Sequence, residues 1–207
     1  MKAEVDAITS VVETPEKPMV VVLGGAKISD KIGVIRTLAG RAEKVLTGGG
    51  IANTFLRAKG WSTGSSLVEE NALQEARGLS RDLNDKIVLP VDLMVAEDLS
   101  PEVKARAVAA DEIPAKMTAA DIGPETIAHY RKLLDPAKTV VWNGPLGVFE
   151  IDEFATGTRR MAEILAGMNA KVVCGGGDSV AAVRSGGYAD RFTHVSTGGG
   201  AFLELIE

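Results

Sequence analysis

The sequence has few of the residues that disulfides, zinc sites and nucleophilic catalysis require. Its 207 residues include one cysteine, Cys174, and two histidines, His129 and His194. A single cysteine excludes an internal disulfide and fits a reducing compartment, so we expect a cytoplasmic protein. Two histidines and one cysteine are too few for a typical zinc site, and they leave few candidates for a nucleophile with its base. We expect all three residues to be structural.

Long apolar runs and a strong charge of one sign are also lacking. No run approaches the ~18 apolar residues of a membrane span, and residues 1–18 do not resemble a signal peptide. The net charge is −5, whereas proteins that bind nucleic acid usually present a basic face. We therefore expect neither a membrane nor a nucleic acid as a partner. Hydrophobic residues make up 45% of the chain, which is enough for a sizeable core.

Three familiar nucleotide-binding or kinase signatures are missing. The sequence contains no G-x-x-x-x-G-K-[ST] motif, which argues against a P-loop protein. No G-x-G-x-x-G opens the first helical pattern, so a dinucleotide-dependent dehydrogenase is only a weak alternative. The motif set of the protein kinases is absent as well.

Glycine, in contrast, is plentiful and clustered, with 23 residues in the chain. A repeated pattern places a short apolar run before a glycine cluster, and a helical pattern follows. Runs rich in Val and Ile that alternate with helices predict βαβ units in a parallel sheet. The five examples are MVVVLGGAK (19–27), KVLTGGGIANTFL (44–56), TVVWNGPLGVFE (139–150), KVVCGGGDSVAAV (171–183) and HVSTGGGAFLELI (194–206).

The remaining segments complete one doubly wound α/β domain over residues 19–207. Lys86–Asp98 is a sixth strand candidate, and Leu99–Ile122 is the least regular part, a loop with one weak strand at 104–113. Residues 1–18 form a helical lead-in that Pro15 and Pro18 end. Further helices are predicted at 29–38, 69–83, 124–134, 155–167 and 179–185.

All five glycine clusters follow strands, so we expect them along one edge of the sheet. Ligands of such sheets bind outside the carboxyl ends of the strands. Small residues there let backbone N–H groups and helix starts approach a phosphate closely. The alternative for any single cluster is a tight turn without a ligand.

Lys27 and Lys31 lie four residues apart where the first helical pattern begins. On one helix face they would repel each other, and the positive end of the helix dipole would oppose both. An anion at the glycine edge would reverse both effects, whereas Asp30 would offset the charge only in part. The alternative is that both lysines extend into solvent.

Two further stretches combine polar groups with glycine or apolar residues. In GGGDS, Asp178 could hold Mg²⁺ and Ser179 could donate to a phosphate, or Asp178 could be a helix N-cap. In WNGPLGVFE, Asn143 and Glu150 stand in an apolar turn, a mixture that suits a ribose or adenine pocket. Alternatively, Asn143 caps locally and Glu150 is a surface charge.

Together these stretches resemble the phosphoglycerate kinase family, specifically its C-terminal, nucleotide-binding domain. The family's order is kept from about Pro15 to Glu207. The resemblance implies a monomer with a three-layer Rossmann-like domain, whose six-stranded parallel sheet has the order 3-2-1-4-5-6. The matching stretches are LGGAKISDKI, LTGGGIANTFL, LPVDLMVAED, DIGPET, WNGPLGVFE, GGGDS and HVSTGGGAFLELIE.

The resemblance also implies roles for single residues. Lys27 would hold the phosphoryl group being transferred, Lys31 the nucleotide phosphates, Asp178 the Mg²⁺ ion and Ser179 a phosphate. Asn143 would contact the phosphate–ribose region, Pro145 would wall it and Glu150 would bond the ribose. Gly48, Gly49 and Gly50 would border the adenine; Gly175, Gly176, Gly177, Gly198, Gly199 and Gly200 would donate backbone N–H groups; and Gly25, Ala26, Ala120 and Val148 would complete the nucleotide site.

The implied reaction is reversible phosphoryl transfer from 1,3-bisphosphoglycerate to MgADP, which gives 3-phosphoglycerate and ATP. The sequence departs from the family at Ala119-Ala120-Asp121, where Gly-Leu-Asp is usual, and residues 1–14 resemble an interdomain helix. The family's substrate-binding N-terminal domain is not in this sequence, so we expect binding of ADP or ATP with little or no turnover. The alternative is a non-catalytic nucleotide-binding module that regulates or assembles with a partner.

Overall fold

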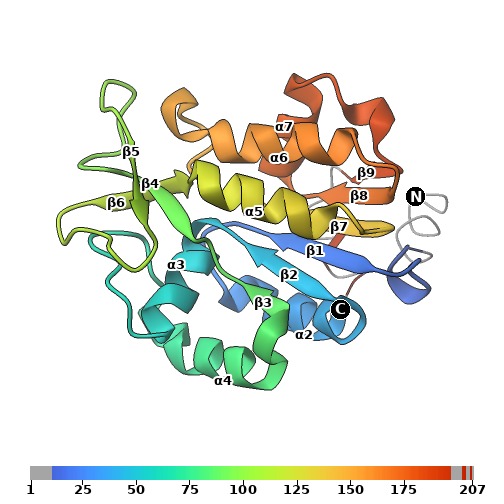
Figure 1. Cartoon of the computed structure of the whole chain (residues 1–207), viewed down its shortest axis with the longest axis horizontal. Coiled ribbons are helices and arrows are strands. Elements are labelled where there is room, and N and C mark those ends of the chain that lie inside the picture. The colour runs from blue at the N-terminus through green and yellow to red at the C-terminus, as the bar shows by residue number, and fades with distance from the viewer. Residues whose placement is uncertain (1–10, 197–201, 204–205, 207) are drawn as a thin grey trace.

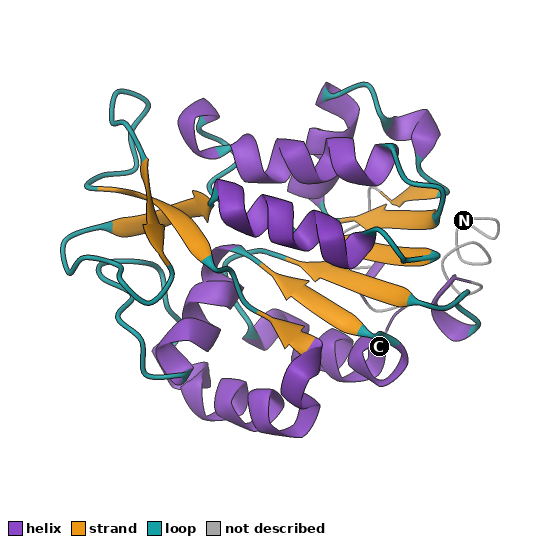
Figure 2. Ribbon diagram, in the orientation of Figure 1, coloured by secondary structure: helices purple, strands orange, loops and turns teal. Residues whose placement is uncertain are grey.

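A six-stranded parallel sheet forms the centre of the molecule, with helices on both faces (Figures 1 and 2). The computed structural model describes residues 11–196, 202–203 and 206. The strand order β3-β2-β1-β7-β8-β9 confirms the predicted order, because these strands follow one another along the chain as β1, β2, β3, β7, β8 and β9. The strands are β1 (Met19–Leu23), β2 (Lys44–Thr47), β3 (Ile87–Val88), β7 (Thr139–Asn143), β8 (Lys171–Gly175) and β9 (His194–Ser196).

Alternation along the central strand builds the core on both faces. In β1, Val20 and Val22 belong to the apolar cluster that contains Tyr130 of α5 and Met161 of α6. Val21 belongs to the opposite cluster, which takes side chains from α2, α3 and α4. The helices are α2 (Ile32–Arg41), α3 (Gly49–Ala58), α4 (Leu73–Leu83), α5 (Pro124–Leu134), α6 (Thr156–Ala166) and α7 (Gly177–Ser185).

The predicted strand over Lys86–Asp98 is wrong as a single element. It divides into β3 and β4 (Asp92–Ala96), which belong to different sheets. Pro90 stands at the break, and proline has no N–H group to donate to a strand ladder. The next residue, Val91, donates its N–H to the Thr126 hydroxyl instead of to a strand.

The irregular segment 99–122 is more ordered than the sequence predicts. It contains the expected weak strand, β5 (Arg106–Ala109), and also β6 (Thr118–Ile122). Both pair antiparallel with β4 in a second, three-stranded sheet. The sequence TAADI has little β propensity. We therefore attribute the formation of β6 to its pairing with β4 rather than to the intrinsic preference of its residues.

The predicted helices are confirmed, with small shifts at their ends. The helix at 124–134 matches its prediction, and α7 begins two residues before Ser179. A short 3₁₀ turn, Ser29–Lys31, precedes α2. Residues 11–13 are helical, and that helix ends before Pro15. Residues 1–10 and the glycine cluster at 198–200 lie outside the described residues.

Two buried aspartates of the small sheet bind the N-termini of two helices on the large one. Asp92 accepts hydrogen bonds from the N–H groups of Glu125 (3.1 Å) and Thr126 (2.7 Å) in α5. Asp121 accepts one from the N–H of Gly157 in α6 at 2.6 Å. The capping residues of both helices offer no side-chain bond of their own, so these carboxylates satisfy the helix starts.

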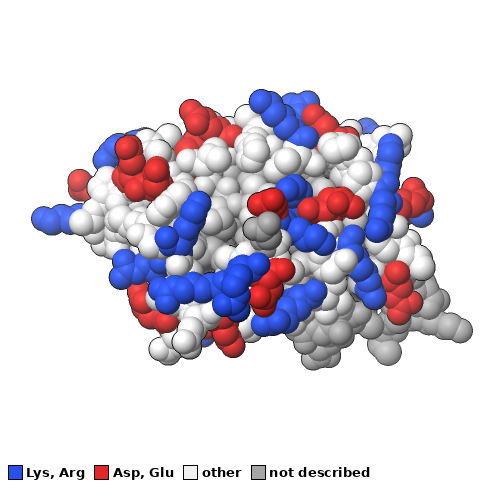
Figure 3. All heavy atoms as spheres, turned by 60° about the horizontal axis from the view of Figure 1, so that its bottom comes forward, with Lys and Arg blue, Asp and Glu red and all other residues white. Residues whose placement is uncertain are grey.

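The surface mixes charges of both signs. On the face in Figure 3, Lys and Arg side chains lie interspersed with Asp and Glu side chains. Among the described residues, every helix is too short or too polar to cross a bilayer.

Candidate functional site

The glycine clusters after β1, β2 and β7 meet at the carboxyl edge of the sheet and interlock there. Gly25 donates its N–H to the Pro145 carbonyl at 2.9 Å, and Gly49 donates to that of Leu146 at 2.9 Å. A Cβ on Gly24 would lie 1.9 Å from the Pro145 oxygen. These glycines therefore serve close loop packing, and the N–H groups of Gly25 and Gly49 are already bonded within the protein.

A cavity of about 270 Å³ opens at this edge. It brings together nine of the predicted site residues from five separate segments of the chain. These are Gly25, Ala26, Gly49, Gly50, Ala120, Pro145, Val148, Glu150 and Asp178. The predicted glycine edge therefore coincides with a concavity, and a ligand there stays a prediction.

Other predicted residues lie beside the cavity rather than in its lining. Lys27 is exposed in the loop after β1, and Gly48, Asn143, Gly175 and Ser179 are buried next to the lining loops. Gly176 and Gly177 form the start of α7, whose next residue, Asp178, lines the cavity. Gly199 lies outside the described residues.

Several lining residues were missed from the sequence. Leu67 and Leu99 are the most informative, because 58% and 39% of their surfaces are exposed although both are large and apolar. Exposed leucines beside a cavity suit a planar apolar ligand. Both stand in irregular loops far from any glycine cluster, so no sequence pattern points to them. The other missed residues are Asn53, Thr118 and Gly147.

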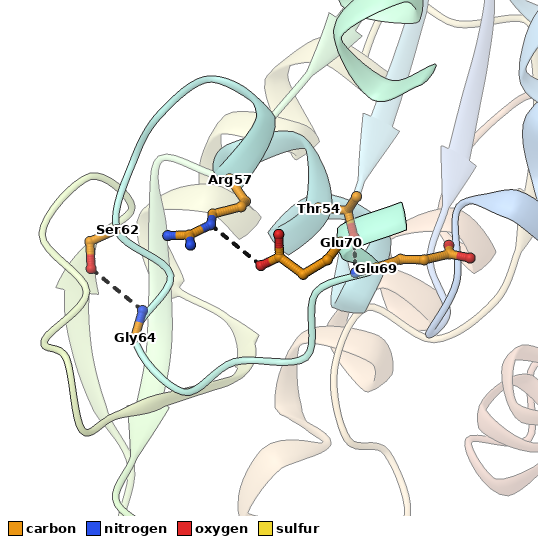
Figure 4. Close-up of polar contacts among 6 residues, drawn as sticks. All are labelled: Thr54, Arg57, Ser62, Gly64, Glu69 and Glu70. Atoms are coloured by element: carbon orange, nitrogen blue, oxygen red, sulfur yellow. Dashed lines mark hydrogen bonds and ion pairs between the residues drawn. The ribbon is translucent and has the colours of Figure 1, made fainter. Parts of the chain in front are cut away.

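The loop that carries Leu67 is tied to the glycine edge by polar contacts (Figure 4). Thr54 donates its hydroxyl to the Gly50 carbonyl at 2.8 Å and accepts the Glu69 N–H at 3.1 Å. Arg57 and Glu70 form an ion pair at 3.5 Å. Within the loop, the Gly64 N–H donates to the Ser62 hydroxyl at 3.4 Å. These contacts connect the loop that carries Leu67 to α3, the helix that follows β2.

Glu69 connects the same loop to the segment after β1. Its Oε2 accepts the Ser29 N–H at 3.0 Å. Partial burial alone would raise the pKa of Glu69, but the hydrogen bonds from Ser29 and the charge of Lys27 hold that pKa below its usual value. The carboxylate therefore stays ionised beside Lys27.

The structure separates the two lysines that the sequence treats as a pair. Lys27 precedes the first helical turn and is exposed, so the expectation that both project from one helix face is wrong. Lys31 ends the 3₁₀ turn before α2 and is 9% exposed. Its Nζ donates to Asn143 Oδ1. Burial lowers the pKa of Lys31 to about 8, although Asp30 and Asp178 favour its charged form.

Asn143 and Ser179 join the ends of neighbouring strands. The Asn143 amide donates to the Gly175 carbonyl at 2.9 Å, so the alternative of a local cap is wrong. The buried Ser179 hydroxyl donates to the same carbonyl at 2.8 Å and accepts the Gly144 N–H at 3.1 Å. A phosphate contact from Ser179 stays a prediction, and it would require this hydroxyl to change partners.

Asp178 is the second residue of α7 and is exposed at the cavity. The N-cap is Gly176, whose φ is +99°, and no side chain caps the helix, so the N-cap alternative for Asp178 is wrong. Within the described part of the chain, no three His, Cys, Asp or Glu side chains cluster as metal ligands. One carboxylate suits Mg²⁺ when phosphates and water supply the remaining ligands.

Four cavities of the described structure are larger, at about 660, 380, 360 and 300 Å³, and none of them is lined by a predicted site residue. One of about 660 Å³ lies between α3, α4 and β3 and includes Phe55, Trp61 and Arg77 in its lining. One of about 380 Å³ lies at the ends of α5 and α6. None of the four is lined by a glycine cluster, so we assign the candidate site to the smaller cavity at the carboxyl edge.

Comparison with known proteins gives one consistent result. The family model for phosphoglycerate kinase matches residues 1–207. A phosphoglycerate kinase of Rubrobacter xylanophilus is 49% identical over the whole chain, and one of Macrococcus caseolyticus is 51% identical. The chain spans 53% and 52% of these two relatives, about half of their length.

Solved structures agree with this result. The structure of phosphoglycerate kinase from Coxiella burnetii superposes with a TM-score of 0.95 at 43% identity, covering 99% of this chain and 54% of that one. The enzyme structure from Pyrococcus horikoshii superposes with a TM-score of 0.88 at 33% identity, covering 100% of this chain and 53% of that one.

Proposed function

The chain belongs to the phosphoglycerate kinase family, and from this premise we propose that its 207 residues form the nucleotide-binding half of such an enzyme. The half would bind MgADP or MgATP at the carboxyl edge of the large sheet. The reaction would be the glycolytic transfer of a phosphoryl group between 1,3-bisphosphoglycerate and ADP in the cytoplasm.

The environment of Lys31 is the observation that most directly supports this proposal. It is a buried cation at a helix start beside the cavity, and its Nζ donates to a neutral amide, that of Asn143. A buried charge without an opposite charge in contact is unfavourable. A phosphate in the cavity would add a negative charge to those of Asp30 and Asp178, which already favour the charged form of Lys31.

The remaining residues fit a nucleotide that lies across the edge. Leu67, Leu99 and Val148 offer an apolar wall for a base, and Glu150 offers a carboxylate to ribose hydroxyls. Asp178 would hold Mg²⁺, which neutralises phosphate charge when it is bound. The first turn of α7, with Gly176 and Gly177, would direct N–H groups toward the phosphates.

Phosphoryl transfer of this kind needs positioning and neutralisation of charge rather than a general base. The attacking group is an anionic phosphate oxygen of ADP, and the leaving group is a carboxylate, so no proton is transferred. We assign Lys27, Gly176 and Gly199 to the transferring phosphoryl group. Lys27 is exposed and directly follows Ala26, which lines the cavity, so a group arriving from outside could reach it.

Calorimetric titration with ADP, with and without Mg²⁺, tests the proposal. We expect saturable binding that Mg²⁺ strengthens and that NAD does not reproduce. Absence of ADP binding by the folded chain, or a preference for NAD, would overturn the proposal.

We further propose that this chain by itself turns over slowly or not at all. The relatives that it matches are about twice its length, and we place phosphoglycerate binding in their other half. An assay with 3-phosphoglycerate and MgATP should therefore show little activity, and adding a separately made partner half should restore it. Full activity of the chain alone would contradict this division of roles.

A further inference from the structure

We propose that Asp121 is a positioning residue in the cavity at the carboxyl edge. It would fix the distance between the two walls that enclose the nucleotide base. One wall is β6 and the other is the loop of residues 144–150. The inference rests on the proposed function, because it concerns how the same cavity holds a nucleotide.

The Asp121 side chain stands where three segments meet. It is 3% exposed. Its Oδ2 accepts the N–H of Gly157 in α6 at 2.6 Å, and its Oδ1 accepts the N–H of Ile122 in β6 at 2.9 Å. The carboxyl group thereby joins β6 to the start of α6.

The loop of residues 144–150 packs directly on this carboxyl group. A Cβ on Gly147 would lie 2.4 Å from Asp121 Oδ1, so only a glycine allows this approach. The next residue, Val148, donates its N–H to the Ala120 carbonyl at 2.7 Å. The loop is also fixed to α6, because Leu146 donates its N–H to the Thr158 hydroxyl at 3.0 Å.

A bulge in β6 explains how the strand forms a wall at this point. Val95 pairs with Ala119 and Met94 pairs with Asp121, which leaves Ala120 as an extra residue. Successive strand residues normally point to opposite sides. Here Ala119 and Ala120 both line the cavity, and a bulge is a device that re-aims side chains next to a site.

The two walls of the cavity therefore meet at one buried side chain. Ala119 and Ala120 lie on one side of it, and Pro145, Gly147 and Val148 lie on the other. Removing the carboxyl group would break the link between β6 and the start of α6 and would leave a gap beneath Gly147. The loop would then be held only by the Val148–Ala120 and Leu146–Thr158 hydrogen bonds and could shift relative to β6. The walls would then hold the nucleotide base less closely. Lys31 and the first turn of α7, which we propose bind the phosphates, would keep their positions.

Asp92 provides a matched control within the same small sheet. It is buried, caps α5 as Asp121 caps α6, and has its own closely packed glycine, Gly123, whose Cβ would lie 2.2 Å from the Asp92 Cγ. The residues that contact Asp92, which are Gly123, Glu125 and Thr126, do not line the cavity, whereas Gly147, which packs on Asp121, does. Loss of either aspartate should therefore destabilise the fold, but only loss of Asp121 should change how the base is held.

The experiment measures binding of ADP and of pyrophosphate, both with Mg²⁺, to the full chain and to the variants Asp121→Ala, Asp121→Asn and Asp92→Ala. For Asp121→Ala we expect ADP affinity to fall about tenfold while pyrophosphate affinity changes less than about twofold. Asp121→Asn keeps one acceptor and should lose less. Asp92→Ala should lower the melting temperature and leave the ratio of the two affinities unchanged.

The outcomes separate this inference from the proposed function. If the unaltered chain binds neither ligand, the proposed function fails. If it binds ADP but the affinity ratio is unchanged in Asp121→Ala, or changes equally in Asp92→Ala, the positioning role alone is overturned. If Asp121→Ala does not fold, Asp121→Asn decides by the same ratio, since equal losses for both ligands would contradict the inference.

Discussion

At the scale of single residues, Lys31 is a charged group that folding removes almost completely from water. Its lowered pKa means that the charged form of Lys31 is less stable in the folded chain than in the unfolded chain. Between about pH 8 and 10.5 the folded state releases a proton that the unfolded state keeps, so stability rises with pH over that range. Below pH 8 the full penalty of the buried charge is present.

Replacing Lys31 by methionine should therefore separate binding from stability. We expect the ligand-free variant to be as stable as the parent or more stable by ~1 kcal/mol, because a desolvated charge is removed. ADP affinity should fall at least about tenfold. The exposed Lys27→Met is the control, with an unchanged melting temperature and a smaller loss of affinity. A clear drop in the melting temperature of Lys31→Met would show that the lysine is structural.

Asp178 should be needed for the effect of Mg²⁺ and not for the fold. It is exposed and caps no helix, so Asp178→Asn should melt within a few degrees of the parent. Titration of ADP should then show nearly equal affinity with and without Mg²⁺. Asp30→Asn, which removes an exposed carboxylate that also acts on Lys31, should keep the Mg²⁺ effect. Persistence of that effect in Asp178→Asn would exclude this carboxylate as the ligand.

Asp121 should make the free energy of unfolding fall as pH rises, whereas Lys31 makes it rise. Burial raises the pKa of Asp121 from 3.8 to about 7, against two N–H donors that favour the ionised form. Between these values the folded chain keeps a proton that the unfolded chain has lost, so the free energy of unfolding falls as pH rises, by up to about 1.4 kcal/mol per unit. Urea unfolding from pH 4.5 to 7.5 should show this slope reduced in Asp121→Asn. Parallel curves for parent and variant would contradict a raised pKa.

The sequence predicts the part of the candidate site that lies at the strand ends better than the part that irregular loops supply. Gly25, Pro145 and Asp178 follow from clusters beside strands, because topology brings strand ends to one edge. Leu67 and Leu99 could not be found, since they reach the cavity through irregular loops. The burial of Lys31 and the exposure of Lys27 could not be found either, because they depend on where the first helical turn begins.

At the scale of elements, strong apolar periodicity made the large sheet and its helices predictable. The small sheet was predicted only in part. A weak strand was expected where β5 lies, but Ala and Asp in β6 carry no strand signal, and the sequence around Pro90 does not show that β3 and β4 belong to different sheets. Its attachment to α5 and α6 through Asp92 and Asp121 is a tertiary feature. Local sequence patterns do not encode such long-range caps.

Glycines within helices should respond differently to alanine according to what surrounds them. A Cβ on Gly50, in the first turn of α3, would lie 2.2 Å from the Ala26 carbonyl oxygen, so Gly50→Ala should destabilise the fold by about 1–3 kcal/mol. Gly78, in α4, has nothing within 4 Å of that position, and Gly78→Ala should stabilise by about 0.5–1 kcal/mol. Chemical denaturation measures both. Equal effects of the two substitutions would mean that helix propensity, not loop contact, decides at Gly50.

At the scale of the whole molecule, the site draws on loops from both halves of the large sheet. Gly25 and Gly49 come from one half, and Pro145 and Asp178 come from the other. A ligand that binds only this assembled edge stabilises the folded state by mass action. We expect MgADP at a hundred times its Kd to raise the free energy of unfolding by about 2.7 kcal/mol. An unchanged melting curve at saturating MgADP would contradict binding to the folded edge.

The strand order also has a consequence for the time course of folding. The central strand β1 pairs on one side with β2, which follows it closely, and on the other side with β7, where Met19 meets Thr139. A ribosome extends the chain at about 5–20 residues per second. For several seconds, therefore, the edge of β1 that will pair with β7 has no partner strand. During that time the apolar sequence of β1, MVVVL, can pair with other chains. Newly made protein should therefore be most prone to aggregate before β7 emerges, and most in need of a chaperone in that interval.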